Sequence, residues 1–319
     1  MTTLDQVKLL KKRMGDNVIG QQDVIEKILV GLLTDGNVLL EGLPGLAKTR
    51  AVKSLAHHLE CKLSRIQFTP DLLPADVTGT EIYQPQSAEH FIFQPGPIFS
   101  NLVLADEINR APAKVQSALL EAMEERQVSV AGKTHKMEPL FMVLATQNPI
   151  EQEGTYPLPE AQLDRFVMKI QITYPDNDSE IRIVRLVREE AKGQEATNET
   201  IPQQAIFDAR KEINGVNVSE AAEKYLTGII TATRYPDQFS KDLQRWLSYG
   251  ASPRGSIGLD RCARTIAWMD ARDYVTPEDI RYAVHDVLRH RIILSYEANV
   301  AKMSADDVID ELLKVVAVV

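Results

Sequence analysis

The residues that point most clearly to a chemical function form a glycine-rich loop between an apolar run and a helical pattern. The loop consists of Gly42, Leu43, Pro44, Gly45, Leu46, Ala47, Lys48 and Thr49. Between a strand and a helix, the backbone N–H groups of such a loop and the partial positive charge of the helix N-terminus bind phosphate oxygens. Lys48 would then reach the β- and γ-phosphates, and the Thr49 hydroxyl would bind Mg²⁺. Ala47 departs from the strict pattern, which has glycine there, so a tight strand-to-helix turn is the alternative.

A pair of carboxylates follows a second apolar run, Leu102–Ala105. Asp106 could hold Mg²⁺ through its water shell, because Mg²⁺ prefers oxygen ligands and keeps several waters. Glu107 could orient and deprotonate the water that attacks the γ-phosphate. An acidic pair that caps a helix is the alternative, and the presence of the glycine-rich loop favours the nucleotide site.

Three further residues are candidates on spacing alone. Asn148 follows an apolar run and could hydrogen-bond the attacking water or a γ-phosphate oxygen, but Asn-Pro is also a common start of a turn. Arg165 could reach across a subunit boundary and stabilise phosphoryl charge in trans, and an ion pair with Asp164 or Glu160 is the alternative. Arg254 could fold back onto the nucleotide, or it could be a solvated arginine at the start of a helix.

The elements that must position these residues alternate between short apolar runs and helical patterns, which predicts an α/β class with a parallel sheet covered on both faces. The predicted strands are Asn37–Leu40, Leu63–Phe68, Leu102–Ala105 and Leu140–Thr146. The predicted helices are Leu4–Arg13, Gln21–Leu33, Thr49–Leu59 and Pro112–Glu125. We expect two hairpins, Thr80–Phe93 and Gln127–His135, the second turning near Ala131 and Gly132.

Beyond Tyr174 the pattern predicts helices only. We therefore expect an α/β core over residues 1–175 and an all-helical lid over residues 176–319, with a loop at Ala191–Thr200. Thr276 and Asp279 predict a capping box at the start of one lid helix.

The composition is ordinary for a folded protein, with 319 residues, 44% hydrophobic and 25% charged. The net charge of −9 argues against broad non-specific nucleic-acid binding. Cys61 and Cys262 lack metal-site spacing, and we expect both to be reduced and buried. No apolar stretch approaches the ~20 residues of a membrane span, and no secretory signal is visible. The sequence therefore predicts a cytoplasmic protein with no membrane insertion.

With these motifs in this order, the chain resembles the AAA+ ATPases and, within them, the MoxR family. The matching stretches are residues 96–112, 116–123, 145–149 and 153–166. The resemblance implies a P-loop NTPase core with a helical lid, in which Thr80–Phe93 is the helix-2 insert and Gln127–Lys136 the pre-sensor 1 hairpin. Ala47 becomes a family trait, since MoxR-like loops commonly have Ala-Lys at this point.

The resemblance also implies roles for the candidate residues. These are Lys48 and Thr49 in Walker A, Asp106 and Glu107 in Walker B, Asn148 as sensor 1, Arg165 as the arginine finger, Arg254 as sensor 2, and Val18, Ile19 and Gly20 along the adenine. Arg50, the residue after the loop, joins the predicted nucleotide-binding set.

We expect an ATPase that uses ATP and Mg²⁺ and works as an ATP-promoted ring, a hexamer, with ATP between the core, the lid and the next subunit. Kinship implies a chaperone that remodels or assembles a client protein, often with a von Willebrand factor A partner. A nucleic-acid motor is one alternative, since Lys133, His135 and Lys136 give the second hairpin a basic tip, although the first insertion carries Glu81 and Glu89. A nucleotide-gated binding module with little turnover is the other.

Overall fold

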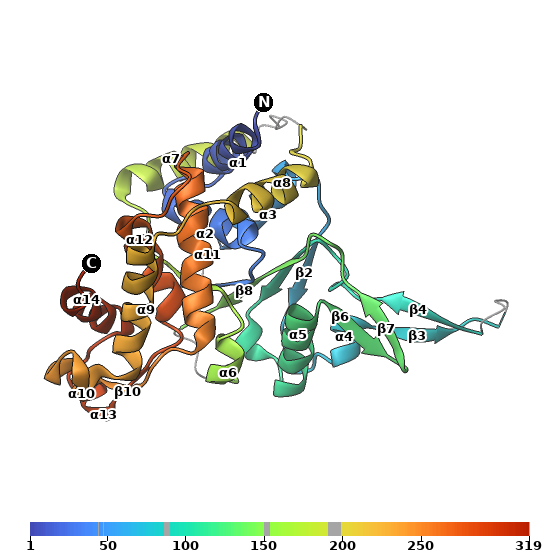
Figure 1. Ribbon diagram of the computed structural model, residues 1–319. Coiled ribbons are helices and arrows are strands. Elements are labelled where there is room, and N and C mark those ends of the chain that lie inside the picture. Colours follow the sequence, from blue (N-terminus) through green and yellow to red (C-terminus); the bar gives the residue numbers. More distant parts are fainter. Residues whose placement is uncertain (44, 47, 86–89, 150–153, 191–198, 319) are drawn as a thin grey trace.

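A five-stranded parallel sheet forms the centre of the computed structural model, which describes residues 1–43, 45–46, 48–85, 90–149, 154–190 and 199–318 (Figure 1). Its strands are β1 (Val38–Gly42), β2 (Leu63–Gln67), β5 (Leu102–Asp106), β8 (Met142–Gln147) and β9 (Met168–Ile172), in the order β2-β5-β8-β1-β9. The predicted α/β class and four strands are confirmed.

The edge strand β9 was not predicted. It has a neighbour on one side only, β1, and its burial alternates along the chain, with polar Lys169 and Gln171 between the buried residues. A search for continuous apolar runs finds central strands of a parallel sheet and misses such an edge strand.

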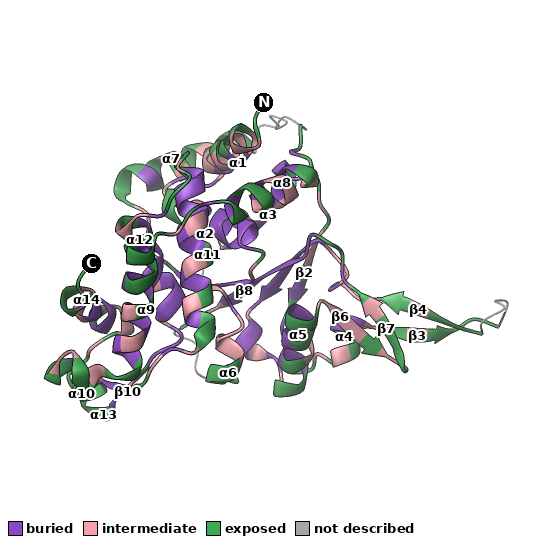
Figure 2. Ribbon diagram, viewed as in Figure 1, coloured by how far each residue is buried: buried purple, intermediate pink, exposed green. Residues whose placement is uncertain are grey.

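Helices cover both faces of the sheet. The core helices are α1 (Thr3–Asn17), α2 (Gln22–Leu33), α3 (Lys48–His58) and α5 (Ala113–Glu125), with the short α4 (Pro74–Thr78), η1 (Ile108–Arg110) and α6 (Glu160–Leu163) between strands. Leu102 and Leu104 of β5 belong to the hydrophobic cluster that contains α2 and α3, whereas Val103 and Ala105 belong to the cluster that contains α5. This alternation explains why β5 is buried along its whole length, and its neighbour β8 is almost entirely buried as well (Figure 2).

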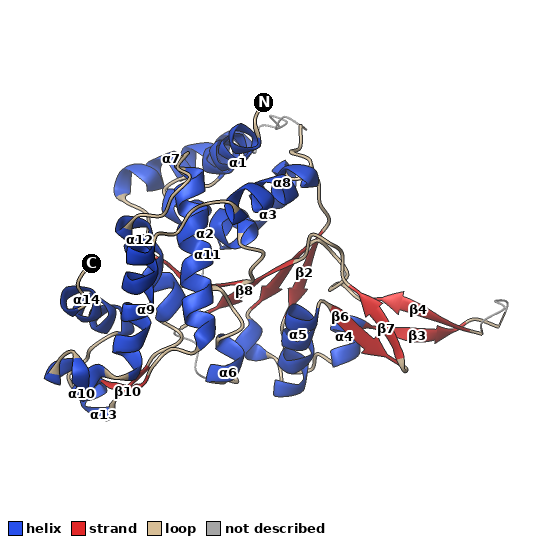
Figure 3. Cartoon of the chain, in the orientation of Figure 1, coloured by secondary structure: helices blue, strands red, loops and turns tan. Residues whose placement is uncertain are grey.

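Both predicted hairpins are confirmed. The first pairs β3 (Gly79–Tyr83) with β4 (Phe91–Pro95), and the second pairs β6 (Gln127–Val130) with β7 (Lys133–Lys136). The second turns at Ala131 and Gly132, both with positive φ, as a two-residue hairpin turn requires. Figure 3 shows the hairpins together on one side of the sheet, where the His135 ring stacks on Phe93 with centroids 3.8 Å apart.

The C-terminal part is mostly helical. Its elements are α7 (Asn177–Glu190), α8 (Gln203–Asn214), α9 (Glu220–Arg234), η2 (Pro236–Gln238), α10 (Lys241–Trp246), α11 (Pro253–Met269), α12 (Pro277–Leu288), α13 (Tyr296–Val300) and α14 (Ala305–Val315). The predicted capping box at Thr276 and Asp279 is present. Most of the predicted loop Ala191–Thr200 lies outside the described residues.

The prediction of helices alone after Tyr174 is wrong. A small antiparallel pair joins β10 (Leu247–Tyr249) to β11 (Ile293–Leu294). Two such short strands, far apart in the sequence, leave no local periodicity and are visible only once the chain has folded.

The C-terminal helices are held to the sheet by buried polar contacts. Arg291 follows α12 and donates to the Asp164 carboxylate (2.8 Å) and to the carbonyl oxygens of Phe166 and Val167. His290 Nε2 lies 3.0 Å from the Phe166 carbonyl oxygen. These contacts fix α12 against β9, and the apolar packing of α8 and α11 on α1 and α2 adds to them.

The cysteines are both free, as predicted, and the described residues contain no helix that is long and apolar enough to cross a membrane. Cys262 is buried, as expected, but Cys61 is only partly buried. Burial raises the pKa of each thiol to about 12, so neither is a reactive thiolate near neutral pH.

Burial of His290 should make stability depend on pH. Loss of hydration, reinforced by the charge of Arg291, holds the pKa of His290 well below its ordinary value. When pH falls below about 6.5, the unfolded chain takes up a proton that the folded chain does not, so the free energy of unfolding decreases, by up to about 1.4 kcal/mol per pH unit. Urea unfolding at several pH values should show a weaker decrease for His290→Gln. Some decrease should remain, because burial also lowers the pKa of His58. An unchanged slope in the variant would contradict this account.

Candidate nucleotide-binding site

The phosphate loop, residues 42–49, lies between β1 and α3 at the carboxyl edge of the sheet. Lys48 Nζ donates to the Gly42 carbonyl oxygen at 2.6 Å and to the Gln147 carbonyl oxygen at 3.4 Å, which ties the loop to the end of β8. Gly45 has φ of +83°, a conformation that favours glycine. Pro44 and Ala47 lie outside the described residues. The strand–loop–helix context required for phosphate binding is therefore present.

Asp106, the last residue of β5, is buried at the same edge of the sheet. Its Oδ1 accepts a hydrogen bond from the Thr146 hydroxyl at 2.6 Å, and its Oδ2 accepts from Nε and Nη2 of Arg65 at 3.0 and 2.7 Å. Arg65 comes from β2, whose residue Gln67 is in register with Asp106. Three neighbouring strands thus converge on one carboxylate.

Glu107 follows in a left-handed backbone conformation, with φ of +57°. Its N–H donates to the Thr146 hydroxyl at 2.9 Å, while its Oε2 accepts from Gln67 Nε2 at 2.9 Å and lies 3.1 Å from Arg110 Nε. A non-glycine residue in this region costs free energy and persists when its surroundings fix it, which is common at functional sites. The carboxylate is therefore held at a defined place beside Asp106.

The sequence reasoning missed Arg65, Gln67 and Thr146. Arg65 and Gln67 are two residues apart at the end of β2 and so point to the same side, and Thr146 is close to the end of β8. Their position was the available signal, because polar residues at the carboxyl ends of parallel strands meet at one edge of the sheet. That signal becomes usable only when the strand order is known.

Asn148 directly follows Gln147, whose carbonyl oxygen accepts from Lys48, and it is buried. It therefore lies close to the phosphate loop, and its predicted contact with the attacking water or the γ-phosphate stays a prediction.

The predicted adenine segment lies next to the same loop. Gly42 pairs in register with Ile172 at the end of β9, and Gln21 donates to the carbonyl oxygen of the next residue, Thr173, at 2.9 Å. Val18 and Ile19 are buried. Gly20 has φ of +76°, and a Cβ there would come within 2.7 Å of Ser179 Cβ. A side chain at position 20 would thus be both strained and crowded.

Arg50 connects this region to two helices. Its Nε donates to the Asn17 carbonyl oxygen at 2.7 Å, and its guanidinium pairs with Glu190 of α7. Arg50 therefore fixes the start of α3 against the ends of α1 and α7, and nothing in these contacts tests its predicted role in nucleotide binding.

Arg165 and Arg254, the arginine pair, share one acceptor. Arg165 Nη2 lies 3.0 Å from Glu124 Oε2, and Arg254 Nη2 pairs with Glu124 Oε1. The expected intramolecular alternative for Arg165 is thus present, but with Glu124 in place of Asp164 or Glu160.

The arginine pair lines a cavity of about 390 Å³ that also contains Asp35, Gly36 and Asn37. These three residues lead into β1, whereas the phosphate loop leaves its other end. β1 has five residues, so its first and last residues lie about 13 Å apart at about 3.3 Å per step. In this structure Arg254 lies away from the phosphate loop of its own chain, because α11 begins at the opposite end of the sheet, so the expected fold-back onto its own nucleotide is not present in this conformation. The position of ATP between the core, the lid and the next subunit stays a prediction.

The residues expected to hold Mg²⁺ suit that ion. The donors are the Thr49 hydroxyl and the Asp106 carboxylate, and hard oxygen ligands in small number are what Mg²⁺ uses when waters and phosphate oxygens complete its shell. The described residues contain no cluster of three or more histidine, cysteine, aspartate or glutamate side chains that could hold a metal alone. Asp106 would share its oxygens between the ion's water shell, Arg65 and Thr146.

Two parts of the chain match known protein families. Residues 37–168 match the family described as ATPase family associated with various cellular activities (AAA), and residues 243–312 match the AAA lid domain. The chain is 46% identical over 320 residues to Chaperone MoxR1 of Mycobacterium tuberculosis, covering 99% of this chain and 82% of that protein. The chain belongs to the MoxR family of AAA+ ATPases.

Other MoxR relatives extend the match. Protein MoxR of Methylorubrum extorquens is 30% identical over 95% of this chain and 92% of its own length. A crystal structure of a candidate ATPase from Cytophaga hutchinsonii superposes with a TM-score of 0.92 at 45% identity, covering 99% of this chain and 96% of that one. The predicted AAA+ core with a helical lid is therefore confirmed for this MoxR-family chain.

Thr146→Val should impair the site while leaving its shape. The change removes the hydroxyl that donates to the buried Asp106 carboxylate and accepts from Glu107, and it leaves the partly buried Glu107 N–H without this acceptor. An unsatisfied buried donor costs about 1–3 kcal/mol, so we expect turnover of ATP to fall by about tenfold or more. Steady-state hydrolysis, with thermal melting to verify folding, would measure this. Thr146→Ser keeps the hydroxyl and should retain most activity, and full activity in Thr146→Val would refute the assigned role.

Proposed function

We propose that this chain is a Mg²⁺-dependent ATP hydrolase whose active site is completed by a second copy of the chain. The observation that carries the proposal is the division of the site. The phosphate loop, Asp106 and Glu107 gather at the carboxyl edge of the sheet, and the arginine pair lies beyond the opposite end of β1.

In this proposal, each residue has a defined task. Backbone N–H groups of the phosphate loop and Lys48 bind the β- and γ-phosphates, and Thr49 and Asp106 hold Mg²⁺, which supplies charge neutralisation when bound. Glu107 orients the attacking water and accepts its proton, and Asn148 positions that water or a γ-phosphate oxygen. Val18, Ile19 and Gly20 lie along the adenine.

The arginine pair would act on the nucleotide of a neighbouring chain. A guanidinium placed on the transferring phosphoryl group stabilises its charge, and it can come from another subunit. A head-to-tail contact that repeats closes into a ring when the rotation closes. We propose an ATP-promoted hexameric ring, with residue 175 as the boundary between core and lid.

The proposed use of hydrolysis is to remodel or assemble a client protein, in the manner suggested by a relative named as a chaperone. A von Willebrand factor A domain protein is a candidate client or partner. The two hairpins, which lie side by side, would pass the motion of the ring to the client.

A nucleic-acid motor is the second candidate, because the tip of the β6–β7 hairpin is basic. Two contacts weigh against it. Lys133 Nζ lies 4.0 Å from Glu81 Oε1, and His135 stacks on Phe93. Both groups are thus engaged by the neighbouring hairpin, which favours a protein client. Stimulation of hydrolysis by DNA with a steep salt dependence would favour the motor.

Lys48→Ala and Glu107→Gln should separate binding from hydrolysis. Lys48→Ala removes the cation at the phosphates, so ATP binding should be lost. Glu107→Gln keeps the shape but cannot accept a proton, so it should bind ATP and fail to hydrolyse it. Equilibrium binding of a fluorescent ATP analogue and steady-state phosphate release measure the two properties. Wild-type turnover in Glu107→Gln would remove Glu107 from the proposed mechanism.

Mixing two inactive variants tests completion of the site in trans. Arg165→Ala should bind ATP and fail to hydrolyse it, whereas Lys48→Ala should bind none but still present Arg165. In a mixed assembly, a Lys48→Ala chain can supply its arginine to the nucleotide of an Arg165→Ala chain. We expect phosphate release well above the sum of the separate variants. The double variant Lys48→Ala/Arg165→Ala, mixed in the same way, should give no gain.

Full activity of Arg165→Ala alone would exclude the arginine from catalysis. A mixture no more active than its parts would contradict the shared site. Activity per chain that does not rise with protein concentration would instead favour a binding module with little turnover.

A further inference from the structure

We propose that Glu124 is a positioning residue that holds Arg165 and Arg254 together as one unit, ready to engage the triphosphate of a neighbouring chain. This inference rests on the proposed shared site, and it names a residue whose role is distinct from phosphate contact. Glu124 would act through the two guanidinium groups.

The contacts of Glu124 have the geometry of a bridge. Its Oε2 lies 3.0 Å from Arg165 Nη2, and its Oε1 pairs with Arg254 Nη2. Each guanidinium has five N–H donors in a rigid fork, so one donor can stay on Glu124 while the others face a ligand. Arg165 follows α6 and Arg254 starts α11, so the carboxylate joins segments that are far apart in the sequence.

The other carboxylates of the cavity are already engaged. Asp164 accepts from the buried Arg291 at 2.8 Å and from Ser252 at 2.8 Å, and it lies 3.9 Å from Arg254 Nη1. Asp35 pairs with Arg126 at 3.0 Å. Glu124 is therefore the carboxylate available to Arg165 among the described residues that line this cavity.

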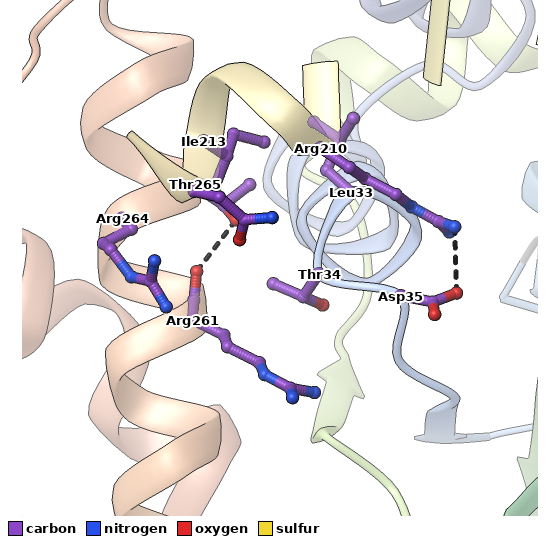
Figure 4. A pocket seen from close by; sticks show the side chains of 9 residues that line it. Leu33, Thr34, Asp35, Arg210, Ile213, Arg261, Arg264 and Thr265 are labelled. Carbon is purple, nitrogen blue, oxygen red and sulfur yellow. Dashed lines mark hydrogen bonds and ion pairs between the residues drawn. The ribbon is translucent and has the colours of Figure 1, made fainter. Parts of the chain in front are cut away.

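Asp35 also lines an adjoining cavity of about 240 Å³, where it has a second cationic partner. There Asp35 pairs with Arg210 of α8, at 2.9 Å, and Figure 4 shows Thr34 between Asp35 and Arg261 of α11. Arg261, two helical turns after Arg254 on α11, lines both cavities and has no ionic partner among the described residues.

The cavity of about 390 Å³ lined by Arg165 and Arg254, here called the arginine cavity, has a charge that suits an anion. Its lining has five arginines, at positions 126, 165, 254, 261 and 291, and three carboxylates, at positions 35, 124 and 164, so cations exceed anions by two. This excess stands out in a chain of net charge −9. Without the charge of Glu124, two neighbouring guanidinium groups would repel each other and lose their common orientation.

Glu124 also sits on a fixed support. It lies in the last turn of α5, whose Val115, Leu119 and Met123 are buried against the sheet. Arg126, with φ of +53°, ends the helix and donates to the Phe141 carbonyl oxygen at 2.5 Å. The β6–β7 hairpin begins at the next residue. A movement of the β6–β7 hairpin would therefore shift the last turn of α5, and with it Glu124 and the two arginines that it contacts.

The test places Glu124→Gln in either partner of the mixed assembly described above. Glu124→Gln keeps the size of the side chain and removes its charge. On the Lys48→Ala chain, which donates the arginines, it should lower phosphate release by about tenfold to a hundredfold, since small misplacements of a catalytic group have effects of that size. On the Arg165→Ala chain, which binds the nucleotide, it should have no effect on release.

Three further measurements make the result specific. Glu125→Gln on the donor chain makes the same charge change one residue along the exposed end of α5 and should leave phosphate release unchanged. Glu124→Asp on the donor should restore part of the loss. In the otherwise wild-type chain, Glu124→Gln should lower kcat while ATP binding and assembly, measured by light scattering, stay intact.

The possible failures are distinguishable. A mixture of Lys48→Ala and Arg165→Ala without any gain overturns the shared site itself. A normal gain that Glu124→Gln on the donor leaves unchanged, or increases, overturns the role of Glu124 alone. An equal loss from Glu124→Gln on either chain, or a loss of assembly, would show a general structural effect and also overturn it.

Discussion

The parallel pairing of β5 with β8, and of β8 with β1, is the constraint on which the candidate site depends. Because the strands run in the same direction, their carboxyl ends meet at one edge, and Lys48, Asp106 and Thr146 come together there. The register is tight, since a shift by one residue would turn Asp106 from the edge toward the apolar clusters on the faces. The buried strands hold this register because Leu and Val side chains fill both faces.

At the carboxyl edge of the sheet, the polar side chains form hydrogen bonds with one another. The Thr146 hydroxyl both donates to Asp106 and accepts from Glu107, and Arg65 and Gln67 of β2 hold the two carboxylates from the other side. The contact between Thr146 and Asp106 is buried, and the contacts from Arg65 are partly buried, so these bonds are costly to break. These contacts support the left-handed conformation of Glu107, which presents its carboxylate beside Asp106.

The same strand direction separates the arginine pair from the phosphate loop. β1 enters the sheet beside the arginine cavity and leaves it at the loop, so one chain cannot bring both to one nucleotide in this conformation. The contacts of Arg291 and His290 with the segment before β9 fix α11 and α12 at the entry side. In the proposed assembly, a second copy would place its arginine pair at the phosphate loop of the first. Glu124 would hold the two arginines in position before that contact forms.

Local sequence signals were enough to predict most of the elements around the site and the residue types at their ends. Glycine at positions 42 and 45, the Lys-Thr pair, the apolar runs before Asp106 and Asn148, and the hairpin turn at Ala131 and Gly132 are signals written within a few residues, because turns and strand patterns are local. Which distant residues meet became visible only in the folded chain. Arg65 with Asp106, Gln67 with Glu107, the β10–β11 pair, and the side of the sheet on which Arg254 lies all depend on strand order and helix packing. Strand order and helix packing are set by the burial of apolar faces across the whole chain. This burial depends on residues far apart in the sequence, so no single position reveals it.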